Sequence, residues 1–408
     1  MKCRHCNTDV TLTLIDLGSA PPSNAYLTKK TIQLPEKSFP LRVMVCEQCW
    51  LVQTEDFANA NELFTSDYAY FSAVSSSWLA HCKKYVDDVV TRFSFNSQHF
   101  VVEVASNDGY LLQYVKAHNI PCMGIEPTAS TAKSARKKGV MVVEEFFGTV
   151  LAKKLVLENK QADLMIANNV LAHVPDINDF VSGFGILLKE NGVATFEFPH
   201  LLNLIEQDQF DTIYHEHFSY LSFTTVSKIF AFNGLSIFDI EELPTHGGSL
   251  RVFAQKTKTK RQPCSPRVVQ LLEKERVLGV TSGEYYARFQ NNAIKIKNDF
   301  LDFLLHIRKS GKKVIGYGAA AKGNTLMNFA SINTSDIECV IDRSPEKQGK
   351  MLPGSRIPVY DEAHLKKIKP DYIIIFPWNL KREIVLQLQY VKKWGAKFVT
   401  VVPRLEIT

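Results

Sequence analysis

A regular alternation of short apolar runs and helix-like stretches between residues 99 and 199 most constrains the fold of this chain. Five apolar runs have the character of buried parallel strands, and they cover residues 99–106, 121–127, 141–147, 162–169 and 192–199. Stretches with helical spacing separate the first strands, at residues 110–119 and 131–139. This alternation predicts a doubly wound α/β sheet. Because ligands of such sheets bind beyond the carboxyl ends of the strands, functional residues are expected there.

The size and composition of the chain are those of an ordinary globular protein with several domains. Its 408 residues favour two or three domains, and 45% of them are hydrophobic while 22% are charged. No apolar run approaches the ~20 residues that span a bilayer, and the N-terminal residues lack the apolar core of a signal peptide. We therefore expect a cytoplasmic protein without a membrane segment. The net charge of +6, without a long basic stripe, favours small phosphorylated molecules over nucleic acid as partners.

Two C-x-x-C pairs stand near the N-terminus, and they consist of Cys3, Cys6, Cys46 and Cys49. Each pair can aim two thiolates at one point, and two such turns supply the four sulfurs of a closed tetrahedral zinc site. A redox dithiol or a pair of disulfides is the less favoured alternative in a cytosolic chain. The spacing therefore predicts one structural zinc ion per chain, in a small domain that ends near residue 70, without catalysis at the metal.

The turn after the first central strand, "EVASNDGYLL" (103–112), carries acidic residues. Gly109 lets the backbone come close to a ligand, while Glu103 and Asp108 bring carboxylates to the turn. Glu126 closes the next strand, where an acid can accept hydrogen bonds from two ribose hydroxyls. Carboxylates would repel a pyrophosphate, so the turn favours S-adenosylmethionine, which has a ribose and a positive charge but no phosphate. A generic loop of an α/β sheet is the alternative.

The fourth strand ends in "NNVLAHVPD", which adds two amides and a histidine at the same edge of the sheet. The histidine, His173, is either functional or a residue that caps or packs the next helix. The residues expected to bind the cofactor are Glu103, Asn107, Asp108, Gly109, Glu126, Asn168 and Asn169.

A second α/β unit follows a long amphipathic segment at residues 283–311. Residues 313–329 have the order strand, Gly-rich turn and helix, and the exposed amides of such a helix start, with Lys322 beside them, suit a phosphate. Gly316-x-Gly318-x-x-Ala321 is also close to a dinucleotide fingerprint, and Asp342 ends the next strand. A nicotinamide-dependent nucleotide-sugar dehydrogenase or epimerase is therefore an alternative function.

Taken in order along the chain, these motifs resemble the bacterial nucleotide-sugar C-methyltransferases, which methylate C3 of dTDP-linked keto-deoxysugars. The resemblance covers nearly the whole chain and rests on the two C-x-x-C pairs, "YAYFSAVSSSW", "EVASNDGYLL", "NNVLAHVPD", "YHEH", "GYGAAAKGNT" and "DRSPEKQG". It implies a zinc-binding domain (1–70), a Rossmann-like S-adenosylmethionine-dependent methyltransferase domain (71–282) and a Rossmann-like sugar-nucleotide-binding domain (283–408). In the last of these, we expect the sugar nucleotide to be bound by Gly318, Lys322, Asn324 and Arg343.

By the same resemblance, five residues fall on the active-site positions of the family: Tyr68, His173, Tyr214, Glu216 and His217. Three of them lie in "DTIYHEHFSYLS" (211–222), whose chemistry suits the reaction. A neutral imidazole can remove the C3 proton, and hydroxyl groups can stabilise the enolate oxygen that forms. We expect His217 to be the base, Tyr214 and His173 to be oxyanion donors, and Glu216 to orient the base.

Other interpretations of this stretch are a metal site, which would need further ligands from elsewhere, and a structural polar turn. A zinc-dependent interaction module without enzymatic activity is a further alternative for the whole chain. The sugar's substituents and the oligomeric state, monomer or dimer, stay open at this point.

Overall fold

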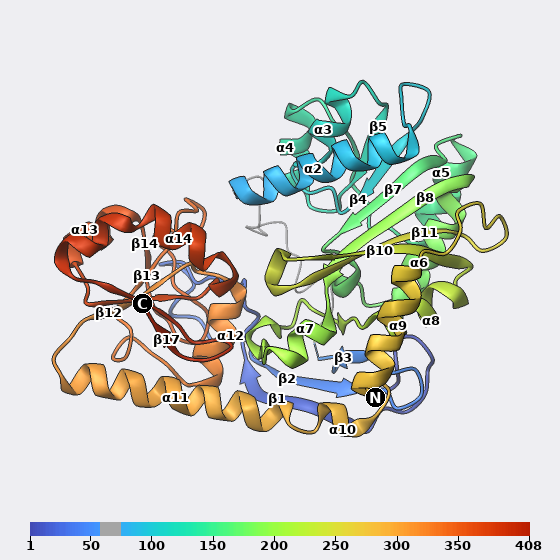
Figure 1. The fold of residues 1–408 in the computed structure, drawn as a ribbon. Coiled ribbons are helices and arrows are strands. Elements are labelled where there is room, and N and C mark those ends of the chain that lie inside the picture. The colour runs from blue at the N-terminus through green and yellow to red at the C-terminus, as the bar shows by residue number, and fades with distance from the viewer. Residues whose placement is uncertain (58–74) are drawn as a thin grey trace.

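The computed structural model describes residues 1–57 and 75–408, and these residues form three β-sheets with their helices (Figure 1). The N-terminal sheet is antiparallel and consists of β1 (Leu12–Ala20), β2 (Phe39–Val45), β3 (Val52–Thr54) and β9 (Ser219–Tyr220). Its last strand comes from the central part of the chain: Tyr220 pairs with Val52 and Ser219 with Gln53. The stretch that carries the candidate acid–base residues is thereby fixed to the N-terminal unit.

The central sheet has seven strands in the order β10-β11-β8-β7-β4-β5-β6. Five of them are parallel, and their bounds are β4 (Val101–Val104), β5 (Cys122–Ile125), β6 (Met141–Val143), β7 (Ala162–Asn168) and β8 (Leu188–Pro199). These are the five strands expected from the sequence, and the doubly wound fold is confirmed. The strand order reverses between β4 and β7, so the carboxyl ends of these two strands form the edge at which such a sheet binds ligands.

Two further strands extend the central sheet in the antiparallel direction. They are β10 (Leu235–Leu243) and β11 (Ser249–Lys256), and β11 pairs with β8 from Ser249 opposite Pro199 to Ala254 opposite Ala194. The connection between them contains Gly247 and Gly248, both with positive φ, beside His246 at φ 56°. The turn between β10 and β11 therefore lies next to the end of β8, close to the ligand-binding edge.

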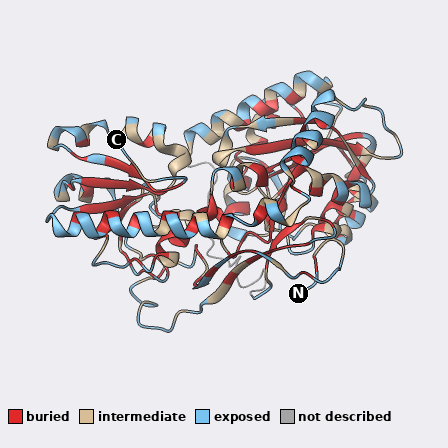
Figure 2. Cartoon of the chain, turned by 60° about the horizontal axis from the view of Figure 1, so that its bottom comes forward, coloured by how far each residue is buried: buried red, intermediate tan, exposed pale blue. Residues whose placement is uncertain are grey.

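Helices cover the central sheet, and their bounds are α2 (Ser76–Phe93), α3 (Leu112–Ala117), α4 (Ala129–Lys137), α5 (Thr149–Leu157), α6 (Ile177–Leu187) and α8 (Phe223–Phe232). The short helix α7 (Leu201–Glu206) instead packs with the N-terminal sheet. All four residues of β4 are buried, as expected for a parallel strand covered on both faces. Figure 2 shows the strands of the larger sheets as mostly buried, while the helices keep exposed outer faces.

The helix α11 (Phe289–Lys309) follows α9 (Pro266–Leu278) and α10 (Gly283–Tyr286) and joins the N-terminal and C-terminal units. Its 21 residues correspond to a length of about 31 Å. Phe289, Ala293, Ile296 and Phe300 recur at helical spacing on its buried face. They belong to one apolar core that also contains residues of β1, β2 and the C-terminal sheet, so this helix holds the two units together.

The C-terminal sheet has the order β14-β13-β12-β15-β16-β17, and it is parallel except for β17. The strands are β12 (Val314–Tyr317), β13 (Val340–Ile341), β14 (Val359–Tyr360), β15 (Tyr372–Ile375), β16 (Lys397–Thr400) and β17 (Glu406–Ile407), and the helices are α12 (Ala321–Phe329), α13 (Glu362–Ile368) and α14 (Lys381–Gln387). The strand order reverses between β12 and β15. The second Rossmann-like unit expected from the sequence is therefore present.

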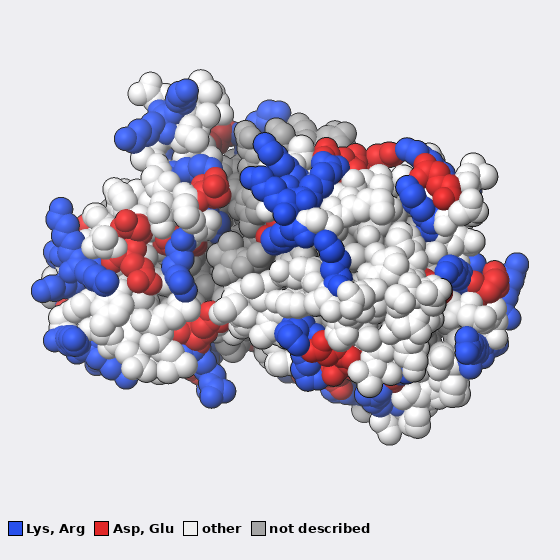
Figure 3. Space-filling view, turned by 90° about the horizontal axis from the view of Figure 1, so that it is seen from above, with Lys and Arg blue, Asp and Glu red and all other residues white. Residues whose placement is uncertain are grey.

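The described helices include none that is both long and apolar enough to cross a membrane. On the face shown in Figure 3, basic side chains gather in one group near the middle and elsewhere lie among acidic ones.

Candidate active site and metal centre

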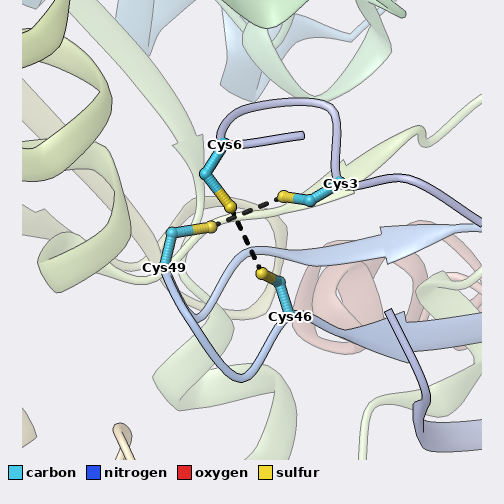
Figure 4. Close-up of side chains that lie close together, drawn as sticks. All are labelled: Cys3, Cys6, Cys46 and Cys49. Atoms are coloured by element: carbon cyan, nitrogen blue, oxygen red, sulfur yellow. Dashed lines mark hydrogen bonds between the residues drawn. The ribbon is translucent and has the colours of Figure 1, made fainter. Parts of the chain in front are cut away.

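The four cysteines of the two C-x-x-C pairs come together beside the N-terminal sheet (Figure 4). The Sγ atoms of Cys3 and Cys49 are 3.5 Å apart, as are those of Cys6 and Cys46. All four sulfurs lie within 4.8 Å of one another. A tetrahedral zinc ion with Zn–S bonds of about 2.3 Å holds its sulfurs about 3.8 Å apart, so this donor set fits zinc. With four protein ligands the site is closed, and its role is structural.

The turn after β4 has an unusual backbone that Glu126 supports. Ala105 and Asn107 adopt left-handed conformations, with φ of 56° and 48°. The Glu126 carboxylate accepts hydrogen bonds from the Asn107 amide (2.9 Å) on one oxygen, and from the Thr128 amide (2.9 Å) and the Thr131 hydroxyl (3.1 Å) on the other. A carboxylate has about four acceptor positions. Three are used here, so Glu126 shapes the turn and has room for about one ribose hydroxyl, where two were expected.

Gly109 is required by the packing of this turn, and the close approach of a ligand there stays a prediction. A Cβ atom at Gly109 would lie 3.2 Å from the Ala135 Cβ and 3.3 Å from the Val140 Cγ2, and its φ is +74°. Glycine is needed because the backbone passes close to the C-terminal part of α4 in a left-handed conformation.

Polar atoms without partners mark the edge between β4 and β7. Asp108 Oδ1 and both amide atoms of Asn168 are buried and have no hydrogen-bond partner among residues 1–57 and 75–408, although Lys138 Nζ contacts the other Asp108 oxygen at 3.2 Å. Burial also raises the pKa of Glu103 well above its usual range. Unpaired buried polar groups are costly, so they indicate a ligand with donors and acceptors. This edge fits the adenosine part of S-adenosylmethionine.

His217 is held by the main chain of its own stretch. Its Nδ1 lies 2.9 Å from the Thr212 carbonyl oxygen, in the 3-10 helix η3 (Phe210–Thr212). Because a carbonyl only accepts, Nδ1 carries the proton and Nε2 is the basic nitrogen. Burial, with a contribution from His173, lowers the pKa of His217 well below its usual value. The imidazole is therefore neutral at neutral pH, as a general base must be.

His173 and Tyr214 pack against this imidazole. The ring centroid of Tyr214 is 3.9 Å from that of His217, and the His173 centroid is 4.6 Å from it. His173 Nδ1 donates to the Glu216 carbonyl at 2.7 Å, and burial lowers the His173 pKa to about 4. Its Nε2 then carries no proton at neutral pH. In this state the Tyr214 hydroxyl can donate to an oxyanion, and the role of His173 as an oxyanion donor stays a prediction.

The side chain of Glu216 contacts the N-terminal unit. Its Oε1 accepts a hydrogen bond from the Asn24 amide at 3.0 Å, and burial raises its pKa. The Thr212 carbonyl orients His217, and a part for Glu216 in orienting the base stays a prediction. Glu216 contributes its main-chain carbonyl, which holds His173. The remaining candidate, Tyr68, lies outside the described residues.

The C-terminal candidates divide into buried and accessible residues. Asn324 is fully buried and its amide donates to the Ser23 carbonyl at 2.6 Å, so it ties the N-terminal segment to α12, and a contact with the substrate stays a prediction. At Gly318, φ is +86° and a Cβ atom would lie 2.5 Å from Pro377 Cδ, so glycine is required by the turn. Arg343 is exposed after β13 and stays a candidate for the diphosphate.

Lys322 reaches towards the end of β15 and keeps partial exposure. Its ammonium donates to Asn379 Oδ1 at 2.9 Å and lies 4.3 Å from the centre of the Trp378 ring. Burial lowers the pKa of Lys322, while the Asp211 carboxylate acts in the opposite direction. The helix start and this lysine are thus present as expected, and the ammonium contacts the side chains of Trp378 and Asn379.

A buried ionic network beside the cofactor edge was not predicted from the sequence. Glu197, near the end of β8, accepts hydrogen bonds from Arg251 (2.6 Å) and Thr245 (3.0 Å), and His81 contacts both of its oxygens at 2.9 and 3.0 Å. The neighbouring His246 contacts the Asn169 amide at 2.9 Å. An acid inside the apolar run "GVATFEFP" was the one signal in the sequence that could have revealed this network.

Three family models match successive parts of the chain. A zinc binding domain matches residues 3–64, a methyltransferase domain matches residues 78–239, and a C-methyltransferase C-terminal domain matches residues 244–403. Among solved structures, similar chains include the PH0226 protein from Pyrococcus horikoshii OT3, with 15% identity, 47% of this chain and 99% of that chain covered, and a TM-score of 0.39. Another is magnesium protoporphyrin IX methyltransferase from Synechocystis PCC 6803, with 15% identity, coverage of 44% and 79%, and a TM-score of 0.34.

A relative along almost the full length is the C-methyltransferase NovU of Streptomyces niveus. It is 31% identical over 402 residues, which cover 98% of this chain and 95% of NovU. The methyltransferase and zinc-binding domains give this protein two cofactors, S-adenosylmethionine and zinc. The chain belongs to the family of S-adenosylmethionine-dependent C-methyltransferases that includes NovU.

Proposed function

We propose that this protein transfers a methyl group from S-adenosylmethionine to C3 of a dTDP-linked 4-keto-deoxysugar. The observation that carries the proposal is the state of His217: its Nδ1–H is bound to the Thr212 carbonyl at 2.9 Å, and burial keeps the ring neutral. A neutral imidazole with Nε2 unprotonated is the group needed to remove a proton next to a ketone. The similarity to the C-methyltransferase NovU supports methyl transfer to carbon, and the sugar nucleotide is proposed from the resemblance of the sequence motifs.

The proposed reaction begins with removal of the C3 proton by His217 Nε2. The C–H electron pair moves into the C3–C4 bond, and the ketone oxygen takes the negative charge. The Tyr214 hydroxyl is the proposed donor to this oxygen, since its ring lies against that of His217. Bound S-adenosylmethionine supplies an electrophilic methyl group, to which C3 forms its new bond as the sulfur–methyl bond breaks.

Binding of the two substrates divides between the two Rossmann-like units. The edge between β4 and β7, with Asp108, Asn168 and Glu126, is proposed to hold the methyl donor. The sugar nucleotide is proposed to occupy the C-terminal unit, where Arg343 is exposed beside the Gly-rich turn. The domain limits proposed for this division are residues 1–70, 71–282 and 283–408.

The dehydrogenase or epimerase alternative rests on the Gly-rich turn of the C-terminal unit and on Asp342, which contacts that turn. One oxygen of Asp342 accepts from the Ala319 amide at 2.7 Å, and the other accepts from the Ser344 amide at 2.8 Å. This carboxylate thus closes the Gly-rich turn. Calorimetry with NAD, S-adenosylmethionine and dTDP separately tests the division: the proposal requires binding of the last two only.

The proposal is tested by hydrogen exchange at C3. The wild type, incubated with the keto-sugar nucleotide and an unreactive cofactor analogue in heavy water, should introduce deuterium at C3. His217→Ala should lose exchange and methylation by about 10²–10⁴ while still binding both ligands. His215→Gln is the matched control, since His215 lies in the same turn but faces the carbonyls of Phe39 and Pro40. Exchange at the wild-type rate in His217→Ala would refute His217 as the base.

A further inference from the structure

Lys322 occupies the position at which a doubly wound sheet binds its ligand. It lies in the first turn of α12, after β12, while Trp378 and Asn379 follow β15. The order of the C-terminal sheet reverses between these two strands, and ligands of such sheets bind in the crevice at that point. The Lys322 ammonium is held there by Asn379 at 2.9 Å and by the face of Trp378 at 4.3 Å.

Trp378 connects this lysine to two segments of the central unit. Its indole Nε1–H donates to Asp211 Oδ2 at 2.8 Å. The far edge of the same ring packs against Gly247, where a side chain would collide with it. Gly247 follows His246, which contacts Asn169 at the cofactor edge. The cation of the C-terminal unit is therefore fixed at a junction with both the acid–base stretch and the cofactor edge.

The same junction sets the position of His217 relative to Lys322. Asp211 directly precedes Thr212, whose carbonyl holds the His217 Nδ1–H. From α12, the helix that carries Lys322, the Thr325 hydroxyl donates to the Ile213 carbonyl at 2.7 Å. The base and the lysine thus belong to one hydrogen-bonded frame, although they come from different units of the chain.

We propose that Lys322 is a catalytic residue, whose ammonium group donates a hydrogen bond to the ketone oxygen of the sugar and stabilises the enolate. The inference rests on the proposed function and assigns Lys322 to the reacting sugar instead of the diphosphate. His217 Nε2 takes the C3 proton, the electron pair moves towards the ketone oxygen, and the lysine keeps its protons throughout. When C3 forms its bond to the methyl group, the ketone is restored and the negative charge disappears.

Three features favour the reacting oxygen as the target of Lys322. An ammonium has three donors, and Asn379 takes one. Asp211 Oδ1 is buried in the same cluster and has no partner within the described part of the chain, so a hydroxyl next to the ketone can donate to it. The charged and titratable groups facing the lysine are Asp211, His217 and His246, and its charge contributes to the low pKa values of both histidines. A positive charge close to the base suits an enolate that forms beside that base.

Kinetics of two substitutions separates the two roles of a cation at this site. Lys322→Met should lower kcat and C3 exchange by about 10²–10³, the cost of one oxyanion donor, with KM for the sugar nucleotide nearly unchanged. Arg343→Met, on the diphosphate side, should instead raise KM. Lys322→Arg should recover part of the lost kcat because it keeps a charged donor. Lys381→Met is the control that should behave as wild type, since Lys381, the first residue of α14, pairs with Glu406 of β17.

The fall of kcat at high pH tests whether Lys322 acts in the reaction, since a purely structural role of Lys322 would not change the pH at which kcat falls. Asp211→Asn removes the charge that favours the ammonium form, so the fall in kcat at high pH should shift to lower pH. A raised KM with unchanged kcat in Lys322→Met, or full C3 exchange with loss of methylation alone, would overturn the inference while leaving the proposed function intact. A wild type that neither exchanges nor methylates would overturn the proposed function, and the inference with it.

Discussion

His217 donates its Nδ1–H to the carbonyl oxygen of Thr212 at 2.9 Å, only five residues earlier in the chain. A main-chain carbonyl cannot change its protonation state, so it fixes one tautomer over the whole pH range in which the protein is folded. Nε2 is therefore always the nitrogen that takes up a proton. This is the arrangement in which a buried histidine works as a base without a carboxylate partner.

The first prediction concerns the acid side of the pH–rate profile. Burial and His173 lower the pKa of His217 well below its ordinary value of 6.5. A base is active when neutral, so a lowered pKa moves the loss of activity to lower pH. The rate of C3 exchange by the wild type should therefore stay constant as pH falls through 6.5. Circular dichroism at each pH controls for unfolding, and a rate that halves at or above pH 6.5 would contradict the buried state of this ring.

The second prediction concerns the zinc site. Cys46→Ser should release the metal and lower the free energy of unfolding, because a structural zinc site couples binding to folding. Elemental analysis should give about one zinc per chain for the wild type and much less for the variant. Cys264→Ser is the matched control, since Cys264 is exposed and outside the sulfur cluster. A protein stripped of zinc that unfolds at the same denaturant concentration would speak against a structural role.

The third prediction concerns Glu126, which holds the turn after β4 through Asn107 and Thr128. Glu126→Gln keeps the size of the side chain but turns one acceptor into a donor that faces an amide. Affinity for S-adenosylmethionine should fall by about ten- to a hundredfold, or roughly 1.5–3 kcal/mol, with dTDP binding nearly unchanged. Calorimetry with each ligand measures both, and Glu144→Gln, on the exposed surface of the same unit, is the control. Equal losses for the two ligands would show that Glu126 acts on the fold as a whole.

Most parallel strands of the two Rossmann-like units were predictable because they are short apolar runs that are largely buried, whereas β14 has only 2 residues and leaves no such run. The strands β10 and β11 were not, since their place is set by antiparallel pairing to β8 and by the turn at Gly247 and Gly248. The pairing of β9 with β3 joins residues 219–220 to residues 52–53. A contact between such distant segments leaves no local pattern in the sequence.

At the site, residue types were predictable but their partners were not. His217, the second histidine of "YHEH", could be predicted as a base, but its partner is a main-chain carbonyl, which every residue has. Glu216 adjoins His217 in the chain, but successive residues in this turn point in different directions, and its carboxylate meets Asn24 of the N-terminal unit. Lys322 suggested a phosphate because of its helix start, whereas its contacts with Trp378 and Asn379 depend on the folded C-terminal sheet.

The last prediction concerns the buried network at the end of β8. Burial alone would raise the pKa of Glu197, but the His81 hydrogen bond and the Arg251 charge outweigh it and lower the pKa to about 2. The lowered pKa means that the folded state favours the carboxylate. The stability that it contributes is present above the ordinary pKa of 4.5 and is lost as pH falls towards 2.

Glu197→Gln should therefore lower the free energy of unfolding at neutral pH by about 3 kcal/mol, because it leaves the buried Arg251 guanidinium with the partly exposed Glu241 carboxylate in place of two charge partners. Glu190→Gln is the matched control. It breaks the ion pair between Glu190 and Lys256, and it should cost less than about 1 kcal/mol because the Glu190 side chain is 71% exposed. Urea unfolding measures both. Adding Arg251→Met to Glu197→Gln should cost less than the sum of the two single changes, since the buried Arg251 charge that Glu197 compensates is then removed as well. Additive losses would mean that Glu197 and Arg251 stabilise the fold independently, and that the ion pair between them is not what holds the end of β8.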